Sequence, residues 1–194
     1  MIYIAVSTNN ALAHHGILGQ KWGIRRYQNP DGTLTEAGKK RYNRSYSKSD
    51  KVFVSGKVKF DEPIPDSVKK ELNSLMRSGA KVLIGDAPGA DTRVQDYLAE
   101  VGYKNVLVYT TDPNARNNVG NWPVKKISGR GRTDEREVRR QKDIAMTNAS
   151  TRAFAISSMD DRPDSAMSLN ISRMAGQNKP TYMYDYKTKR FVYR

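Results

Sequence analysis

The sequence predicts an α/β fold built around a doubly wound parallel sheet, and three observations lead to that prediction. From residue 51 onward, short apolar runs rich in β-branched residues alternate with stretches of helical spacing. Turns made of small residues, with a glycine in each, follow the first two runs. Right-handed crossovers between parallel strands then give the strand order 3-2-1-4-5, numbered along the chain.

Five runs are expected to form the strands of this sheet, and their apolar content is typical of strands buried on both faces. They are the ranges 51–55, 81–85, 105–109, 152–157 and 180–186. The remaining residues, 187–194, follow the last run directly and are expected to close a C-terminal hairpin on it.

Four stretches of helical spacing separate the strands. The first begins at Pro65, because proline is favoured at the first helical position. The second places Leu98 and Val101 on one apolar face, and Gly102 then stands where a left-handed residue would end the helix. The third and fourth stretches cover residues 133–149 and 164–175.

The segment 111–149 carries much basic charge. Its helix, 133–149, starts at an acidic turn suited to the positive end of the helix dipole, and its basic side chains are expected to form mostly a solvated face. These side chains are Arg136, Arg139, Arg140 and Lys142.

Residues 111–132 form a long polar connection, in which Arg116 and Trp122 are expected to act as a lid that neutralises phosphate and stacks on a base. A mobile surface loop with one anchored tryptophan is the alternative.

Composition narrows the classes of function. The chain of 194 residues has no cysteine, and its two histidines are the adjacent His14 and His15. Disulfides and thiolate metal sites are therefore excluded, and a histidine metal site or Ser-His-Asp triad in the later domain is not expected. No apolar run has the length of a membrane span, and no signal sequence is expected. The net charge of +14 favours a polyanionic partner or a diffuse basic surface, although no nucleic-acid-binding motif accompanies it.

Residues 1–50 differ in composition from the domain at 51–194 and are expected to form an irregular arm. Within them, residues 14–42 contain the pattern H-x-G-I-L-G-x-K-W-G-x-R-R, followed by Y-Q-N-x-D-G-x-L-T-x-A-G. This pattern closely resembles a short N-terminal module of proteins from tailed bacteriophages and prophages. The resemblance implies a phage origin, with association with a phage head protein as a candidate role of the arm.

The stretch Lys81–Asp91 is the strongest candidate for a binding site. A buried strand ends there in a turn of small residues and a helix starts at once, so the free amides of the first helical turn would point at an anion. A tight connection without function is the alternative, because the turn matches neither the G-x-G-x-x-G nor the Walker pattern. The turn at Ser55-Gly56 and the segment 157–165 would meet it at the carboxyl edge of the sheet, where open α/β sheets bind ligands.

The candidate ligand-binding residues follow from this convergence and from the expected lid. Asp91 would accept hydrogen bonds from ribose hydroxyls, or it would cap its own helix. The ligand would be a nucleotide or an ADP-ribose derivative, and no metal ligand is expected. The full set is Ser55, Gly56, Gly85, Asp86, Ala87, Pro88, Gly89, Ala90, Asp91, Arg116, Trp122, Ser157, Asp164 and Ser165.

Residues 51–186 resemble the SLOG superfamily of Rossmann-like nucleotide-binding domains, relatives of DNA-processing protein A and of the Lonely Guy phosphoribohydrolases. The matching motifs are V-x-V-S-G at Val52–Gly56, G-x-A-x-G-A-D at Gly85–Asp91 and R-x-x-K-D-x-x-M at Arg139–Met146. Catalytic members carry a P-G-G-x-G-T-x-x-E segment, whose glutamate supports cleavage of an N-glycosidic bond. The corresponding segment here, Arg162–Asn170, has neither the glycine pair nor the glutamate, which favours binding without turnover.

The residues and the resemblance together lead to three hypotheses of different classes. The first is a phage-encoded protein in the cytoplasm of the infected bacterium that sequesters a host immune signalling nucleotide, either ADP-ribose-derived or a cyclic oligonucleotide. It would need no cofactor and, by family analogy, would form a dimer or tetramer. The second is a nucleotide or NAD N-glycosidase that uses Asp86 or Asp91 as its catalytic carboxylate. The third is a virion-associated protein that binds phage head proteins.

Overall fold

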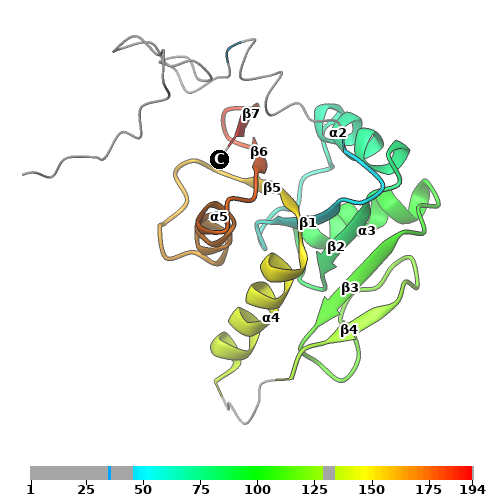
Figure 1. The fold of residues 1–194 in the computed structure, drawn as a ribbon, viewed down its shortest axis with the longest axis vertical. Coiled ribbons are helices and arrows are strands. Elements are labelled where there is room, and N and C mark those ends of the chain that lie inside the picture. Colours follow the sequence, from blue (N-terminus) through cyan, green and yellow to red (C-terminus); the bar gives the residue numbers. More distant parts are fainter. Residues whose placement is uncertain (1–34, 36–45, 129–133, 194) are drawn as a thin grey trace, which may run out of the picture.

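The described strands of the protein form one sheet in a computed structural model, which describes residue 35 and residues 46–128 and 134–193 (Figure 1). Their order across the sheet is β4-β3-β2-β1-β5-β6-β7. Neighbouring strands pair in parallel, except that β7 runs antiparallel to β6. The strands are β1 (Lys51–Gly56), β2 (Lys81–Gly85), β3 (Val106–Thr110), β4 (Val124–Lys126), β5 (Arg152–Ser157), β6 (Thr181–Asp185) and β7 (Arg190–Tyr193).

The predicted α/β class and strand order are confirmed. The five expected runs became β1, β2, β3, β5 and β6, and their order in the sheet, β3-β2-β1-β5-β6, is the predicted 3-2-1-4-5. The strand β1 lies at the centre, where Val52 pairs with Val82 on one side and with Arg152 on the other. The C-terminal hairpin is also confirmed, because β7 pairs with β6 from Tyr182↔Tyr193 onward.

The strand β4 is a correction, since it lies within residues 111–132, for which the sequence predicts a loop. It has three residues, all of them exposed, and so it carries no alternation of apolar and polar positions that could indicate a strand. It pairs with β3 at the edge of the sheet, where Lys125 and Lys126 place charge. Charged residues on an edge strand discourage pairing with another chain.

Helices cover both faces of the sheet, as a doubly wound fold requires (Figure 1). On one face, Val52 of β1 packs in a core that includes side chains of α2 and α3. On the other face, Phe53 packs with Met146 of α4 and Met174 of α5. Neighbouring residues of β1 therefore enter different cores, because successive strand side chains point to opposite faces. The helices are α2 (Asp66–Arg77), α3 (Ala90–Glu100), α4 (Glu135–Ala149) and α5 (Ala166–Gly176).

The ends of two helices differ in detail from the prediction. Pro65 is the N-cap residue of α2 and has extended backbone angles, so it precedes the first helical position. Gly102 has a φ of 72° and follows the C-cap of α3, as predicted. Val101 is 45% exposed because it is that C-cap residue, and the expectation that it shares the apolar face is wrong. Gln95 takes a fully buried position on α3 instead.

The predicted arm lies mostly outside the described residues, and so does its module at 14–42 apart from residue 35. Its last part, from Tyr46 onward, packs on the domain. The Tyr46 hydroxyl donates to Glu71 Oε1 at 2.6 Å, and the Arg152 guanidinium lies 4.7 Å from the centre of the Tyr46 ring. Among the described helices, none has the length and apolar composition that a membrane span requires.

Candidate functional site

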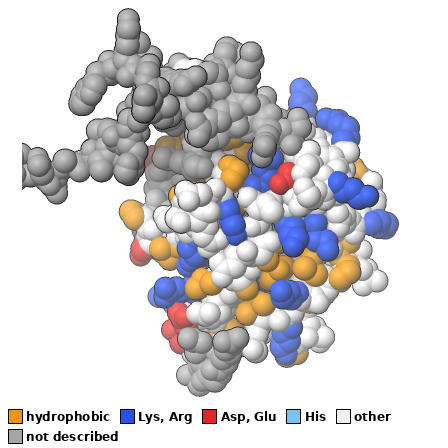
Figure 2. Space-filling model, in the orientation of Figure 1, with side chains coloured by type: hydrophobic (Ala, Val, Ile, Leu, Met, Phe, Trp, Pro, Cys, Tyr) orange, Lys and Arg blue, Asp and Glu red, His pale blue; other side chains and the backbone are white. Residues whose placement is uncertain are grey.

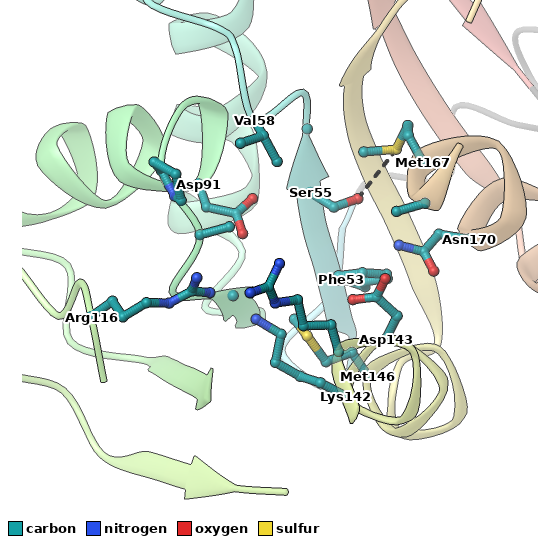
Figure 3. A pocket seen from close by; sticks show the side chains of 16 residues that line it. Phe53, Ser55, Val58, Asp91, Arg116, Lys142, Asp143, Met146, Met167 and Asn170 are labelled. Carbon is teal, nitrogen blue, oxygen red and sulfur yellow. Dashed lines mark hydrogen bonds between the residues drawn. The ribbon is translucent and has the colours of Figure 1, made fainter. Parts of the chain in front are cut away.

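A pocket of about 270 Å³ opens at the carboxyl edge of the sheet, beside the ends of β1 and β2 (Figure 3). Its walls are the two strand ends, the N-terminus of α3, one face of α4 and the start of α5. The sequence predicts a site at this edge, where the strand order changes direction. Of the predicted residues, the pocket is lined by Ser55, Gly56, Gly85, Ala87, Pro88, Asp91 and Arg116.

Two glycines bring the start of α3 against the strand ends. A Cβ added at Gly56 would lie 2.3 Å from the Cβ of Ala90, and one added at Gly85 would lie 2.5 Å from Asp91 Oδ2. Real side chains do not approach so closely, so both positions need glycine. The small residues of the two motifs therefore place the Asp91 carboxyl directly at the end of β2.

The amides of this turn are used within the protein more than the sequence suggests. The Ala90 N–H donates to the Lys57 carbonyl at 3.0 Å, and the Ala87 N–H donates to the Asp91 carboxyl. Gly89, with a φ of 83°, lies against the Lys57 and Val58 carbonyls. Gly89 and Ala90 do not line the pocket, and the expected anion contact of the Ala90 amide is wrong because that amide already has an acceptor.

Asp86 has a structural position. Its side chain is fully buried, outside the pocket lining, and accepts from Thr110 Oγ1 at 2.8 Å, from Lys142 Nζ at 2.7 Å and from Arg116 Nη2 at 3.0 Å. Burial alone would raise the pKa of this carboxyl, but the bonds from Arg116 and Lys142 hold the pKa well below its usual range. Protein donors satisfy both oxygens of Asp86, which favours a structural role over the catalytic role considered from the sequence.

The helix α4 contributes a wall that the sequence interpretation missed. Arg139, Lys142, Asp143 and Met146 all line the pocket, and Lys142 is only 5% exposed. The expectation of a solvated Lys142 is wrong because the buried Asp86 compensates its charge. The four residues have the spacing i, i+3, i+4 and i+7 of one helix face, and this signal was available in the sequence.

Two carboxyls of the pocket titrate above their usual range. Burial raises the pKa of Asp91 to about 7, the neighbouring Lys142 opposes this rise, and the charges of Asp143 and Asp86 add to it. Burial also raises the pKa of Asp143, against the opposing effects of Lys142, Asn170 and Arg173. A carboxyl that titrates near neutral pH can donate a hydrogen bond or a proton as well as accept one.

The remaining wall comes from β1 and α5. The Ser55 hydroxyl, 8% exposed, donates to Met167 Sδ at 3.6 Å, and Asn170 is 5% exposed. Figure 3 shows Ser55, Met167 and Asn170 on one side of the pocket, and Arg116 and Asp91 on the other. Met167 and Asn170 were not predicted as site residues, because neither belongs to a turn or to a charged pattern.

Three predicted residues of the β5–α5 connection lie outside the pocket lining. The buried Ser157 hydroxyl donates to Asp161 within the connection. Ser165 caps α5 and accepts from the Ser168 N–H at 3.1 Å. Asp164 is exposed and lies 3.7 Å from Arg162. The side chains of Ser157 and Ser165 serve the connection and the helix cap, and the expectation that Ser157, Asp164 and Ser165 contact a ligand stays a prediction.

Trp122 belongs to the hydrophobic core. It is 5% exposed, and its indole N–H donates to the Tyr103 carbonyl at 2.8 Å. Gly120 packs so closely that an added Cβ would lie 2.2 Å from the indole ring. The predicted stacking of Trp122 on a base is wrong, because the ring is covered by protein. The alternative of an anchored tryptophan is the one observed, while Arg116 of the same segment does reach the pocket.

No group of three or more histidine, cysteine, aspartate or glutamate side chains is arranged to hold a metal ion within the described part of the chain. Comparison of the chain with protein-family models, with curated proteins and with solved structures gives no match. The geometry of the pocket and the residues that line it are therefore the guide to function.

Proposed function

We propose that the protein binds a nucleotide-type ligand, with phosphate and ribose, in the pocket at the carboxyl edge of the sheet. The observation that carries the proposal is the meeting of Arg116, Arg139 and Lys142 with the Asp91 carboxyl in one pocket. The cationic side chains suit phosphate, and a carboxyl accepts from ribose hydroxyls when it is ionised or donates to a phosphate oxygen when it is protonated. Phe53 adds an apolar surface to the same pocket. Small-molecule sites commonly combine an apolar lining with a few convergent polar groups.

The size of the pocket limits the ligand. At about 270 Å³, it lies near the small end of the range for small-molecule sites, roughly 300–1,000 Å³. A single nucleotide unit fits this volume better than a complete dinucleotide does. A larger signalling nucleotide would therefore place one unit in the pocket and the rest across the exposed Val58 and Arg139 at its mouth.

Binding without turnover is the favoured form of this function. Asn170, the last residue of the segment 162–170, lies in the pocket where the resemblance would place a catalytic glutamate. A neutral amide is neither a general base nor a nucleophile. Together with the phage-like pattern at 14–42, this supports a protein that sequesters a host signalling nucleotide in the cytoplasm of an infected bacterium, as a homo-oligomer.

An N-glycosidase is the second candidate, and one observation favours it. Asp91 lines the pocket, and its pKa is raised to about 7, which is suited to a general acid at neutral pH. Asp143 on α4 would provide a second carboxyl, as glycoside hydrolysis requires. In this alternative the ligand would be recovered as a free base and a ribose phosphate.

A thermal-shift panel with ligand recovery separates these candidates. Its members are AMP, NAD, ADP-ribose, cyclic ADP-ribose and cyclic dinucleotides. A ligand at about a thousandfold excess over its Kd stabilises the protein by roughly 4 kcal/mol, which is a clear shift of the midpoint. Ligand recovered intact supports sequestration, and ligand recovered cleaved supports the glycosidase. If no member shifts the midpoint, the proposal fails and a head-associated interaction protein becomes the better hypothesis.

Neighbouring arginines on α4 supply a matched pair of variants. Arg139 lines the pocket and Arg140 does not, yet both side chains are more than half exposed and each pairs with a glutamate of the preceding turn. We expect Arg139→Gln to weaken binding of the ligand and Arg140→Gln to leave it unchanged. Equal effects of the two substitutions would mean that the ligand binds to the basic surface in general.

A further inference from the structure

The Lys142 ammonium lies at one end of the pocket, in contact with one carboxylate and near two more carboxyls. Asp86 accepts from its Nζ at 2.7 Å, while Asp91 and Asp143 act on the same ammonium electrostatically. Asp91 and Lys142 also lie against the same glycine, because a Cβ at Gly85 would be 2.5 Å from Asp91 Oδ2 and 3.4 Å from Lys142 Nζ. One buried ammonium therefore pairs with Asp86 and lies near the Asp91 carboxyl.

The cations of the pocket already have carboxylate partners. Lys142 pairs with Asp86, Arg116 pairs with Asp86 at 3.0 Å and with Asp112 at 3.2 Å, and Arg139 pairs with Glu135 at 2.6 Å. Each of these bonds neutralises charge that a ligand phosphate would otherwise meet. The pocket therefore does not offer a phosphate three uncompensated positive charges.

Asp91 is the acid most affected by this arrangement. The charged groups facing it are Asp86 from the preceding turn, Arg116 from the connection after β3, and Lys142 and Asp143 from α4; Arg139 lines the same pocket. The described lining from β1 and α5 adds the uncharged polar side chains Ser55 and Asn170. Asp91 is 8% exposed, so water screens its charge poorly.

An anionic ligand entering this pocket would repel an ionised Asp91 at short range. A protonated Asp91 has the opposite effect, because its O–H can donate to a phosphate oxygen, and hydrogen bonds to ionised acceptors are short and strong. Ionised Asp91 therefore repels the ligand, whereas protonated Asp91 attracts it. Since a proton converts one state into the other, ligand and proton favour the same form of the protein.

We propose that the protein takes up one proton together with an anionic phosphate-bearing ligand, that Asp91 carries this proton, and that its carboxylic acid donates a hydrogen bond to a ligand phosphate. This inference rests on the proposed function, and it names the group that regulates the site. The proton comes from solvent, no covalent bond to the ligand forms or breaks, and release of the ligand returns the proton.

The sign of the pH dependence follows directly. The pKa of Asp91 in the free protein is raised to about 7 by burial, and a bound anion raises it further. Below about pH 7 the acid is already protonated in the free protein, so the affinity for the ligand does not change with pH. Above that pH each binding event must add a proton, and the affinity falls by about tenfold for each pH unit until the bound form also ionises.

ADP-ribose is the probe, because its diphosphate is esterified at both ends and each phosphate keeps one negative charge across this range of pH. Isothermal titration calorimetry in two buffers with different enthalpies of ionisation measures the protons taken up. For the wild-type protein we expect uptake near zero at about pH 6 and near one at about pH 8, with affinity falling as described. A cyclic dinucleotide, also a diester, serves as the second probe.

Three variants assign the proton. Asp91→Asn keeps a donor at the same place without a titrating group, so we expect binding without proton uptake and with level affinity. Asp143→Asn should keep the uptake. Asp96→Asn, an exposed change on the same helix outside the pocket, is the matched control and should behave as the wild type.

The outcomes separate this inference from the proposed function. Tight binding by the wild type with no proton uptake overturns the inference and leaves the proposed function standing. Uptake that persists in Asp91→Asn and disappears in Asp143→Asn overturns the assignment to Asp91. If neither probe binds the wild-type protein at any pH, the proposed nucleotide pocket fails, and the inference fails with it. If Asp91→Asn does not fold, the wild-type measurement still decides whether a proton is taken up, and loss of the uptake in Asp143→Asn overturns the assignment to Asp91.

Discussion

Replacing Asp86 by asparagine is expected to destabilise the protein by about 3–5 kcal/mol, the usual cost of leaving a buried charge without its partner. The carboxylate has no exposure and accepts from Thr110, Arg116 and Lys142. Asparagine removes the negative charge and turns one acceptor oxygen into a donor. The Lys142 side chain, 6% exposed, then has no compensating carboxylate at hydrogen-bonding distance.

Urea unfolding at neutral pH measures this loss. The double variant Asp86→Asn/Lys142→Met removes both charges and should recover part of it, because groups in contact show coupling energies of about 0.5–3 kcal/mol. Asp112→Asn, which breaks the more exposed partner of Arg116, is the control and should cost less than about 1 kcal/mol. A loss below about 1 kcal/mol for Asp86→Asn, or strict additivity in the double variant, would refute the argument.

The pH dependence of the same variant has a definite sign. Because the pKa of Asp86 is lowered on folding, its stabilising effect is present above its unfolded pKa, about 3.9, and is lost as the pH falls toward the lower folded value. The difference in free energy of unfolding between wild type and Asp86→Asn should therefore shrink in acid. A difference that grows as the pH falls would contradict the assigned direction of the shift.

Two further predictions concern the start of α3. Because the pKa of Asp91 is raised to about 7, the folded protein binds more protons than the unfolded chain above about pH 4. Through Asp91, urea unfolding of the ligand-free wild type should show stability falling by up to about 4 kcal/mol from pH 4 to 7, and Asp91→Asn should show a clearly smaller fall, with the contribution of Asp143 remaining. Gly89→Ala should cost more than about 2 kcal/mol, since a Cβ there meets the Val58 carbonyl at 2.1 Å. Gly102→Ala, with a similar φ in open space, should cost about 1 kcal/mol, measured by the same urea unfolding.

The strands and their order could be predicted because each buried strand carries its own signal. The runs that form β1 and β2 are apolar and β-branched, and the handedness rule for parallel crossovers then leaves few possible arrangements. The short strand β4 has no such signal, since its residues are exposed and its pairing depends on β3. Local sequence therefore predicts buried strands, but it misses an exposed strand that forms only because it pairs with its neighbour.

The turns of the site could be predicted for a similar reason, whereas the burial of Lys142 on its α4 wall could not. A Cβ at Gly85 would meet Asp91 Oδ2 of the same short motif at 2.5 Å, while one at Gly56 would meet Ala90 of the other motif, and both motifs are recognisable as turns of small residues. Lys142 is buried only because Asp86, far away in the sequence, lies beside it in the fold. Lysine is mostly exposed in proteins, so a solvated Lys142 is the reasonable expectation when its partner is unknown. The wrong prediction therefore reflects missing tertiary information.

Trp122 and Ser165 were expected in the pocket, and a common cause explains why neither lines it. Each residue type has both a structural and a ligand-binding use, and the sequence does not say which neighbours compete for it. The Trp122 indole finds the Tyr103 carbonyl, and the Ser165 hydroxyl finds the Ser168 amide. Once a side chain satisfies a group of its own protein, it has less to offer a ligand, and both residues lie outside the pocket lining for that reason.

Charge in the pocket and charge on the whole chain have different consequences for binding. The chain carries a net charge of +14, and Figure 2 shows its Lys and Arg side chains scattered over the visible face. The electric field of this positive charge can speed the approach of an anion, but salt screens the field beyond about 10 Å. Inside the pocket, Arg116, Arg139 and Lys142 each hold a carboxylate. Raising the salt concentration should therefore slow association, while the pH dependence set by Asp91 persists, because a buried acid is screened far less than a surface charge.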